Sequence, residues 1–173
     1  LVGGGILVDC ADYAIALRWI YSHDNGLPAG NNLIGGRGLL GSWASTDNWD
    51  KLPTDPDWKK DARFKAALKY LMNFSFTHTV FIDAYPVEIS PDFVTPGTIY
   101  LTLEGESGHT RTLTNVGASK DCTQSPECMI IIWGNEPADE RGYITEFVPY
   151  WLAQTDGGIM RFRWPEQGAN GWQ

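Results

Sequence analysis

The chain has 173 residues, of which 43% are hydrophobic and 20% charged, and its formal net charge is -8. This length and composition are typical of one globular domain with a sizeable core, and they exclude an intrinsically disordered chain. The acidic balance argues against a nucleic-acid partner, because the basic cluster at 59–69 reads as the solvated face of a helix, and no apolar run approaches the roughly 18 residues of a bilayer span.

The first element in chain order is a helix that begins at a cysteine. Asp9 is a suitable N-cap, Cys10 falls in the first turn, and the helix extends to about Ser22. This helix is apolar nearly all round, so we expect it at the centre of the fold. The following stretch, 31–53, has no clear period and reads as a long glycine-rich loop that contains Trp43 and Trp49.

The rest of the chain changes from helical to strand-like patterns. A second helix is predicted over 54–73, with Asp55 as its cap and Pro56 in its first turn. Five β-rich runs follow, at 77–89, 97–104, 108–116, 129–134 and 158–164, while 143–153 is ambiguous between a short helix and a loop. Helices followed by strands predict an α+β class in one domain, 1–173.

Two of the three cysteines lie in one polar loop. Cys122 and Cys128 flank the sequence TQSPE, a spacing that suits a disulfide and hence an oxidising compartment, although a pair of free surface thiols is the alternative. A zinc site is not expected, because no further Cys or His lies nearby, and we expect no cofactor. The chain begins at Leu1, so we expect that a leader was removed or that it is part of a longer protein.

The remaining cysteine, Cys10, has two interpretations. It is either a small apolar residue of a core helix or a nucleophile whose pKa is lowered by the helix N-terminus and by a nearby imidazole, giving a thiolate. The chain has three histidines. His109 follows a glycine at the start of a predicted strand, where its side chain can face a cleft, and it is the favoured partner.

The other two histidines fit less well. His23 ends the first helix and is roughly 18 Å from Cys10 at 1.5 Å per residue, and His78 reads as a structural residue of a strand. A third residue usually orients the imidazole. The first polar residues at the end of the next strand are Asn135 and Glu136, and we favour Asn135.

The segment VDCADYAIAL resembles the nucleophile segment of papain-like peptidases of the NlpC type and of the related CHAP amidases. The stretch DFVTPGTIYLTLEGESGHTRTLTNV is similar to their pair of strands, with Pro96–Gly97 at the turn and Gly108–His109 at the start of the histidine strand. A looser resemblance extends to transglutaminase-like proteins. This chain departs from the family in having Thr98 in place of Asp, Ala11 in place of Ser, and a longer stretch between the motifs.

The resemblance implies a papain-like fold, with the cysteine helix on an antiparallel sheet of about five strands and an insertion at about 24–75. It implies a cysteine peptidase or amidase with Cys10 as nucleophile, His109 as base and Asn135 as third residue. Trp43 and Trp49 would wall the substrate groove, unless they pack in the core.

The substrate implied is a peptide or amide bond, most often in peptidoglycan stem peptides, so the protein would lyse or remodel cell walls in a periplasmic or secreted location. The alternatives are a non-catalytic glycan- or peptide-binding module on the same fold, and a domain of a secreted toxin or assembly with an unknown protein partner.

Overall fold

The computed structural model describes residues 6, 8–42, 44, 48–87, 93–105, 107–116, 128–133, 144–149 and 157–165. Of these, residues 104, 114–116, 128–133, 144–149 and 157 are described as backbone alone. Within these ranges the fold is α+β, as predicted, with three helices and two antiparallel sheets. The elements are α1 (Cys10–Asp24), β1 (Gly30–Leu33), β2 (Gly38–Gly41), α2 (Ala62–Asn73), α3 (Thr77–Asp83), β3 (Ala84–Pro86), β4 (Ile99–Glu104), β5 (Ser107–Val116), β6 (Cys128–Trp133), β7 (Ile144–Pro149) and β8 (Gly157–Phe162).

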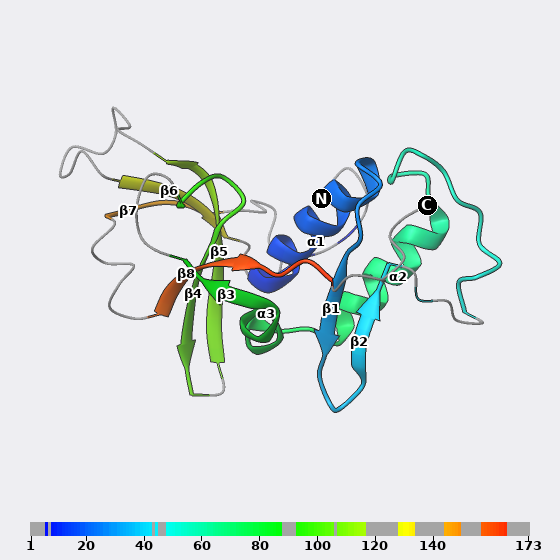
Figure 1. Cartoon of the computed structure of the whole chain (residues 1–173), viewed down its shortest axis with the longest axis horizontal. Coiled ribbons are helices and arrows are strands. Elements are labelled where there is room, and N and C mark those ends of the chain that lie inside the picture. The colour runs from blue at the N-terminus through cyan, green and yellow to red at the C-terminus, as the bar shows by residue number, and fades with distance from the viewer. Residues whose placement is uncertain are drawn as a thin grey trace.

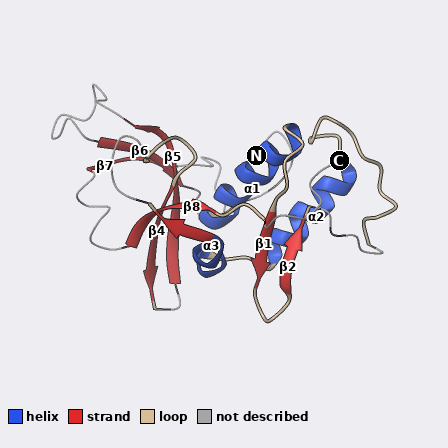
Figure 2. Ribbon diagram, in the orientation of Figure 1, coloured by secondary structure: helices blue, strands red, loops and turns tan. Residues whose placement is uncertain are grey.

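Helix α1 lies between two parts of the molecule (Figure 1). On one side is a six-stranded antiparallel sheet in the order β3-β8-β4-β5-β6-β7, and on the other are α2 and the β1–β2 hairpin. Figure 2 shows α3 beside the large sheet, below the start of α1. None of the helices in the described part of the chain is long and apolar enough to cross a membrane.

The central position of α1 follows from its composition. Its buried side chains include Ile15 and Trp19, both 0% exposed, and one hydrophobic cluster joins them to Phe64 of α2 and Leu101 of β4. The N-terminus of α1 is stabilised by a capping box. The Asp9 carboxylate accepts a hydrogen bond from the Asp12 N–H, and the Asp12 carboxylate accepts one from the Asp9 N–H. The predicted helix and its cap are therefore confirmed.

The second helix was placed too early by the sequence pattern. It begins at Ala62, capped by Asp61, and not near Pro56. The residues before it form side-chain turns instead, because the carboxylate of Asp55 accepts from the N–H of Asp57, and Asp57 accepts from Lys59. Such local bonds compete with helical hydrogen bonding, so the acidic residues that resembled a helix start make a loop.

Three further expectations about elements are corrected. The expected loop contains the hairpin β1–β2, whose turn uses Gly35 and Gly36 at φ 67° and 69°, a conformation that favours glycine. The described part of the run at 77–89, which ends at residue 87, is mainly helix α3, in which Thr77, Val80 and Asp83 recur at helical spacing and are buried, and strand β3 follows it. The ambiguous stretch contains strand β7, paired with β6. The other four predicted strands are found as β4, β5, β6 and β8.

Candidate active site

The first residue of α1 faces the beginning of β5. The Sγ atom of Cys10 lies 3.9 Å from Nδ1 of His109, although the two residues are 99 positions apart in the chain. Cys10 is half-buried and His109 is exposed. The expected proximity of these two side chains, within about 4 Å in a resting site, is confirmed.

A glycine allows β5 to lie close to α3 just before the histidine. A Cβ atom on Gly108 would be 2.5 Å from the carbonyl oxygen of Thr102 and 2.9 Å from Cγ2 of Thr77. In the β4–β5 register Gly108 faces Leu103, and His109 faces Thr102. The absence of a side chain at position 108 therefore sets how closely the strand that carries His109 packs against α3.

We expect Gly108→Ala to disturb the site and the fold together. The added methyl group meets a backbone oxygen that cannot move alone, so the strand must shift, and overpacking of this kind typically costs about 1–3 kcal/mol of unfolding free energy. Urea unfolding measures the loss, with Gly158→Ala as a control, because a Cβ there meets only Met160 at 3.8 Å. Equal stability of the two variants would contradict the close packing at Gly108.

Donors from three elements surround the Cys10 sulfur. The backbone N–H groups of Thr110 in β5 and Ala11 in α1 and the hydroxyl of Thr77 in α3 each lower the pKa of the thiol. Burial and the charge of Asp9 raise it. Burial is the largest effect, and the net result is a thiol pKa raised from its ordinary value.

Of the two interpretations of Cys10, the one in which the helix N-terminus lowers the pKa of the thiol is not supported, because burial raises that pKa. The helix N-terminus does supply N–H groups that lower the pKa of the thiol. Desolvation raises this pKa by more, because Cys10, at the start of α1, is packed against α3 and β5. At neutral pH the thiol keeps its proton. Any attack by this sulfur requires a base that removes the proton at that moment, and the His109 imidazole is within reach.

Thr77 was missed by sequence reasoning, and its effect on the thiol can be measured. Thr77→Val keeps the shape but removes the hydroxyl that favours the thiolate, so the Cys10 pKa should rise further. We expect alkylation of Cys10 by iodoacetamide to slow roughly five- to tenfold at a fixed pH below the pKa, since one pKa unit is tenfold in thiolate. Thr77→Ser is the control that keeps the donor, and an unchanged rate in Thr77→Val would contradict the contact.

The structure places only part of the predicted site. Asn135, Trp43 and Cys122 lie outside the described residues, and Cys128 is the first residue of β6, with its side chain also outside them. The expected imidazole-orienting residue and the expected disulfide thus stay predictions.

Trp49 is corrected to a core residue. It is 3% exposed, its indole N–H donates to the carbonyl of Ala44, and its ring packs 5.4 Å from that of Tyr70. A side chain enclosed in this way cannot wall a substrate groove.

The other two histidines serve contacts away from the sulfur. Nε2 of His78 lies 3.1 Å from the carbonyl oxygen of Gly105, in agreement with a structural role, although on a helix. His23, at the other end of α1, has Nε2 3.2 Å from the Asp61 carboxylate that caps α2 and Nδ1 3.3 Å from Asp24. Among the described residues, no three His, Cys, Asp or Glu side chains gather in a way that could hold a metal ion.

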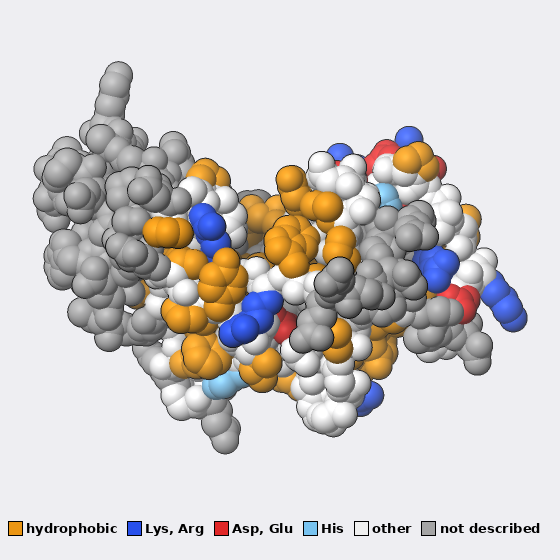
Figure 3. Space-filling view, viewed as in Figure 1, with side chains coloured by type: hydrophobic (Ala, Val, Ile, Leu, Met, Phe, Trp, Pro, Cys, Tyr) orange, Lys and Arg blue, Asp and Glu red, His pale blue; other side chains and the backbone are white. Residues whose placement is uncertain are grey.

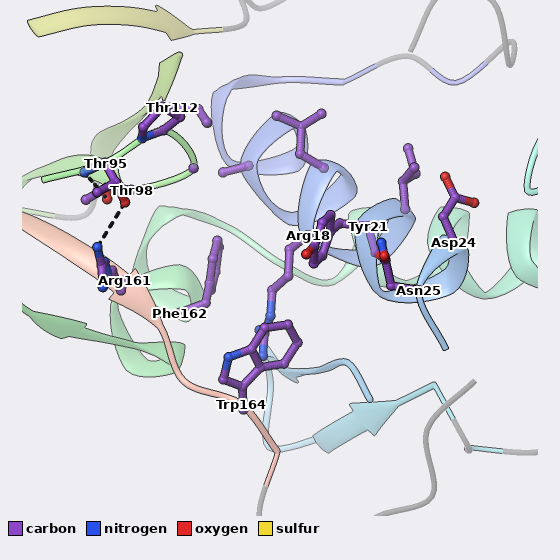
Figure 4. A pocket seen from close by; sticks show the side chains of 15 residues that line it. Arg18, Tyr21, Asp24, Asn25, Thr95, Thr98, Thr112, Arg161, Phe162 and Trp164 are labelled. Carbon is purple, nitrogen blue, oxygen red and sulfur yellow. Dashed lines mark hydrogen bonds between the residues drawn. The ribbon is translucent and has the colours of Figure 1, made fainter. Parts of the chain in front are cut away.

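A pocket of about 700 Å³ lies along α1, and neither Cys10 nor His109 lines it. It starts at Ala14, one helical turn after the cysteine, and extends to Asn25, with the turn before β4 (residues 95–98), Thr112 of β5 and the end of β8 on its other side. Figure 4 shows Arg18 and Tyr21 on the helix side and Thr98, Thr112 and Arg161 on the sheet side. On the face of the molecule drawn in Figure 3, hydrophobic side chains gather across the middle, with basic side chains among them.

Sequence reasoning gave no sign of this pocket, because its residues come from four separate segments with no shared motif.

Comparison with known proteins identifies no relative of the chain. No family model matches it, and neither a curated protein nor a solved structure matches it.

Proposed function

We propose that the protein is a cysteine-dependent hydrolase of peptide or amide bonds, acting on peptidoglycan stem peptides outside the cytoplasm, on a papain-like fold. The observation that carries the proposal is the 3.9 Å approach of Cys10 Sγ to His109 Nδ1, at a helix N-terminus beside an antiparallel sheet. A nucleophile and a base within reach of each other are the minimum for acyl transfer through a thioester.

In the proposed reaction, the Cys10 sulfur attacks the amide carbon as His109 takes the thiol proton. The raised thiol pKa makes this concerted deprotonation necessary. The backbone N–H of Cys10, at the start of α1, would donate to the tetrahedral oxyanion. His109 then gives its proton to the leaving amine, and a water molecule, activated by the same imidazole, hydrolyses the thioester to a carboxylate and the free thiol.

The test is hydrolysis of purified peptidoglycan and of synthetic stem peptides, followed by mass spectrometry of the fragments. We expect new amine and carboxylate ends, and loss of the activity when one equivalent of iodoacetamide has modified Cys10. Fragments that appear equally with the alkylated protein would contradict the proposal, and so would the absence of cleavage of any stem peptide.

The second candidate is a non-catalytic binding module. Two observations favour it: burial raises the pKa of the Cys10 thiol, and the pocket does not include the cysteine. The reactivity of the thiol in the folded protein separates the two functions. In an enzyme, His109→Ala should slow alkylation of the Cys10 thiol at neutral pH, because the imidazole assists loss of the thiol proton. In a binding module, Cys10 should be inert until the protein unfolds, and His109→Ala should have no effect on alkylation.

A further inference from the structure

We propose that the helix side of the pocket, between α1 and the end of β8, binds a neutral saccharide, a short chain of pyranose sugars. The whole pocket has a volume of about 700 Å³, within the range of about 300–1,000 Å³ typical of ligand sites. This site does not depend on whether Cys10 is catalytic, because Cys10 does not line the pocket.

Two large aromatic side chains of the lining stay in contact with solvent. Trp164 is 53% exposed and Tyr21 is 57% exposed, and both line the pocket. Tryptophan and tyrosine combine an apolar ring with a polar tip, so they suit a surface that a ligand covers only in part. Two such rings at one pocket are typical of a binding surface.

The two rings come from surfaces that face each other. On α1, Leu17 and Tyr21 are one helical turn apart and both line the pocket. On β8, Met160 is buried in the core cluster that includes α1, so Phe162, two residues further on, lies on the same face of the sheet. Phe162 does meet α1, because the Arg18 guanidinium lies 4.9 Å from its ring centroid.

Arg18 holds Trp164 in place although the indole is exposed. Its guanidinium lies 5.7 Å from the centroid of the Trp164 ring, and it donates to the carbonyls of Gly30 and of Arg163, the residue before Trp164. Burial lowers the pKa of Arg18 only to about 10, so the cation persists at neutral pH. Figure 4 shows the Arg18 side chain reaching from α1 to this indole. A ring that is fixed before binding loses little conformational freedom when a ligand packs on it.

Hydrogen-bond acceptors follow the aromatic surface along α1. Asp24 and Asn25 both line the pocket, and the Asp24 side chain is 47% exposed. Asp24 uses Oδ1 toward His23, and Asn25 uses Nδ2 to donate to the Tyr21 carbonyl at 2.7 Å. Within the described part of the chain, Oδ2 of Asp24 and Oδ1 of Asn25 accept no hydrogen bond. Both atoms can therefore accept from the hydroxyl groups of a ligand.

The charges on this side of the pocket favour a neutral ligand. Arg18 is positive and Asp24 is negative, and they lie about 9 Å apart along α1 at 1.5 Å per residue. A small anion would be repelled by Asp24 and a small cation by Arg18. A pyranose sugar carries no charge, packs the C–H groups of one face on an aromatic ring, and directs its hydroxyl groups outward. It therefore matches both the rings and the acceptors.

The test is isothermal titration calorimetry with chitotetraose and cellotetraose, and with sorbitol as a polyol that has hydroxyl groups but no ring. We expect at least one of the two oligosaccharides to bind at millimolar concentration or below, and sorbitol not to bind. Trp164→Ala should weaken the binding roughly tenfold and Tyr21→Ala roughly fivefold, because each removes a stacking surface. Trp164→Phe, which keeps a ring, should bind more tightly than Trp164→Ala.

Tyr85→Ala is the matched control. Tyr85 is an exposed tyrosine of β3, 38% exposed, and does not line the pocket, so its replacement should leave binding within about twofold. Melting curves of each variant report folding, and Tyr21→Ala carries the test if the Trp164 variants do not fold. Equal effects of Tyr21→Ala and Tyr85→Ala, equal binding of sorbitol, or no binding of either oligosaccharide at millimolar concentration would each overturn the proposal.

Discussion

Replacing Cys10 by serine or by alanine is expected to lower the hydrolysis of stem peptides at least about 100-fold, which corresponds to about 3 kcal/mol of transition-state stabilisation. Serine keeps the size and polarity, but its hydroxyl has a much higher pKa than a thiol, so His109 alone cannot activate it well. Alanine removes the nucleophile and should be as inactive. Both variants should bind substrate about as well as the wild type.

Stability measurements separate this outcome from simple misfolding. One sulfur at a helix start contributes on the order of 1 kcal/mol, so both variants should melt close to the wild type. His109→Gln should lower turnover as well, whereas His78→Gln, which replaces a histidine bonded to Gly105, should not. Wild-type turnover in the Cys10 variants would refute the proposed nucleophile. If the wild type has no measurable activity and the Cys10 variants are only less stable, Cys10 is a packing residue.

The Cys10–His109 pair could be predicted because its signals are local. Asp9 before Cys10 marks a helix start, and the glycine before His109 marks the start of a strand whose first side chains can face a cleft. The order of the two motifs, which resembles that of papain-like peptidases, then led to the prediction that the two side chains meet, and they do so on α1 and β5. The pKa of the thiol could not be predicted in the same way, because burial depends on how α3 packs against both elements.

The fold was predicted best where one physical signal dominated. Strands β4, β5, β6 and β8 follow from β-branched and apolar runs between Gly or Pro turns. The prediction of a strand at 77–83 was wrong. Its Thr, Val, Phe and Ile residues have high β propensity, yet the segment is a helix in which Val80 and Asp83 are buried at helical spacing. Tertiary contacts decided that segment, and Thr77 was missed as a neighbour of the thiol for the same reason.

One of these contacts is a buried network around Asp83, at the end of α3. One carboxylate oxygen accepts from Nδ2 of Asn31 at 2.7 Å, the other accepts from Nδ2 of Asn32 at 2.6 Å, and the Asn32 backbone N–H donates as well. The Asn31 amide oxygen in turn accepts from the indole N–H of Trp19 at 2.7 Å. Asp83 thus ties the β1–β2 hairpin and α1 to α3.

Removing that carboxylate should have the largest effect on stability. Asp83→Ala leaves three donors of Asn31 and Asn32 without their acceptor in a site where Asp83 itself is 6% exposed, and the buried Arg18 loses the negative charge that favours its protonation. Breaking a buried charged network in this way costs about 3–5 kcal/mol. Urea unfolding at neutral pH measures the loss. As a control, Asp50→Ala removes an ion pair to Arg63 that is about one-third exposed, and should cost less than about 1 kcal/mol.

The cost of Asp83→Ala should also depend on pH in a defined direction. Burial raises the pKa of Asp83 in the folded protein, more than its hydrogen bonds to Asn32 and Asn31 lower it. A carboxyl with a raised folded pKa contributes stability that is fully present below its unfolded pKa, about 3.9, and declines as the pH rises through the folded pKa. The difference in unfolding free energy between the wild type and Asp83→Ala should therefore be larger near pH 4 than near pH 8. If this difference instead grows with pH, hydrogen bonding to the charged form of Asp83 outweighs burial at this site. If Asp83→Ala costs no more unfolding free energy than Asp50→Ala, the network does not hold the β1–β2 hairpin to α3.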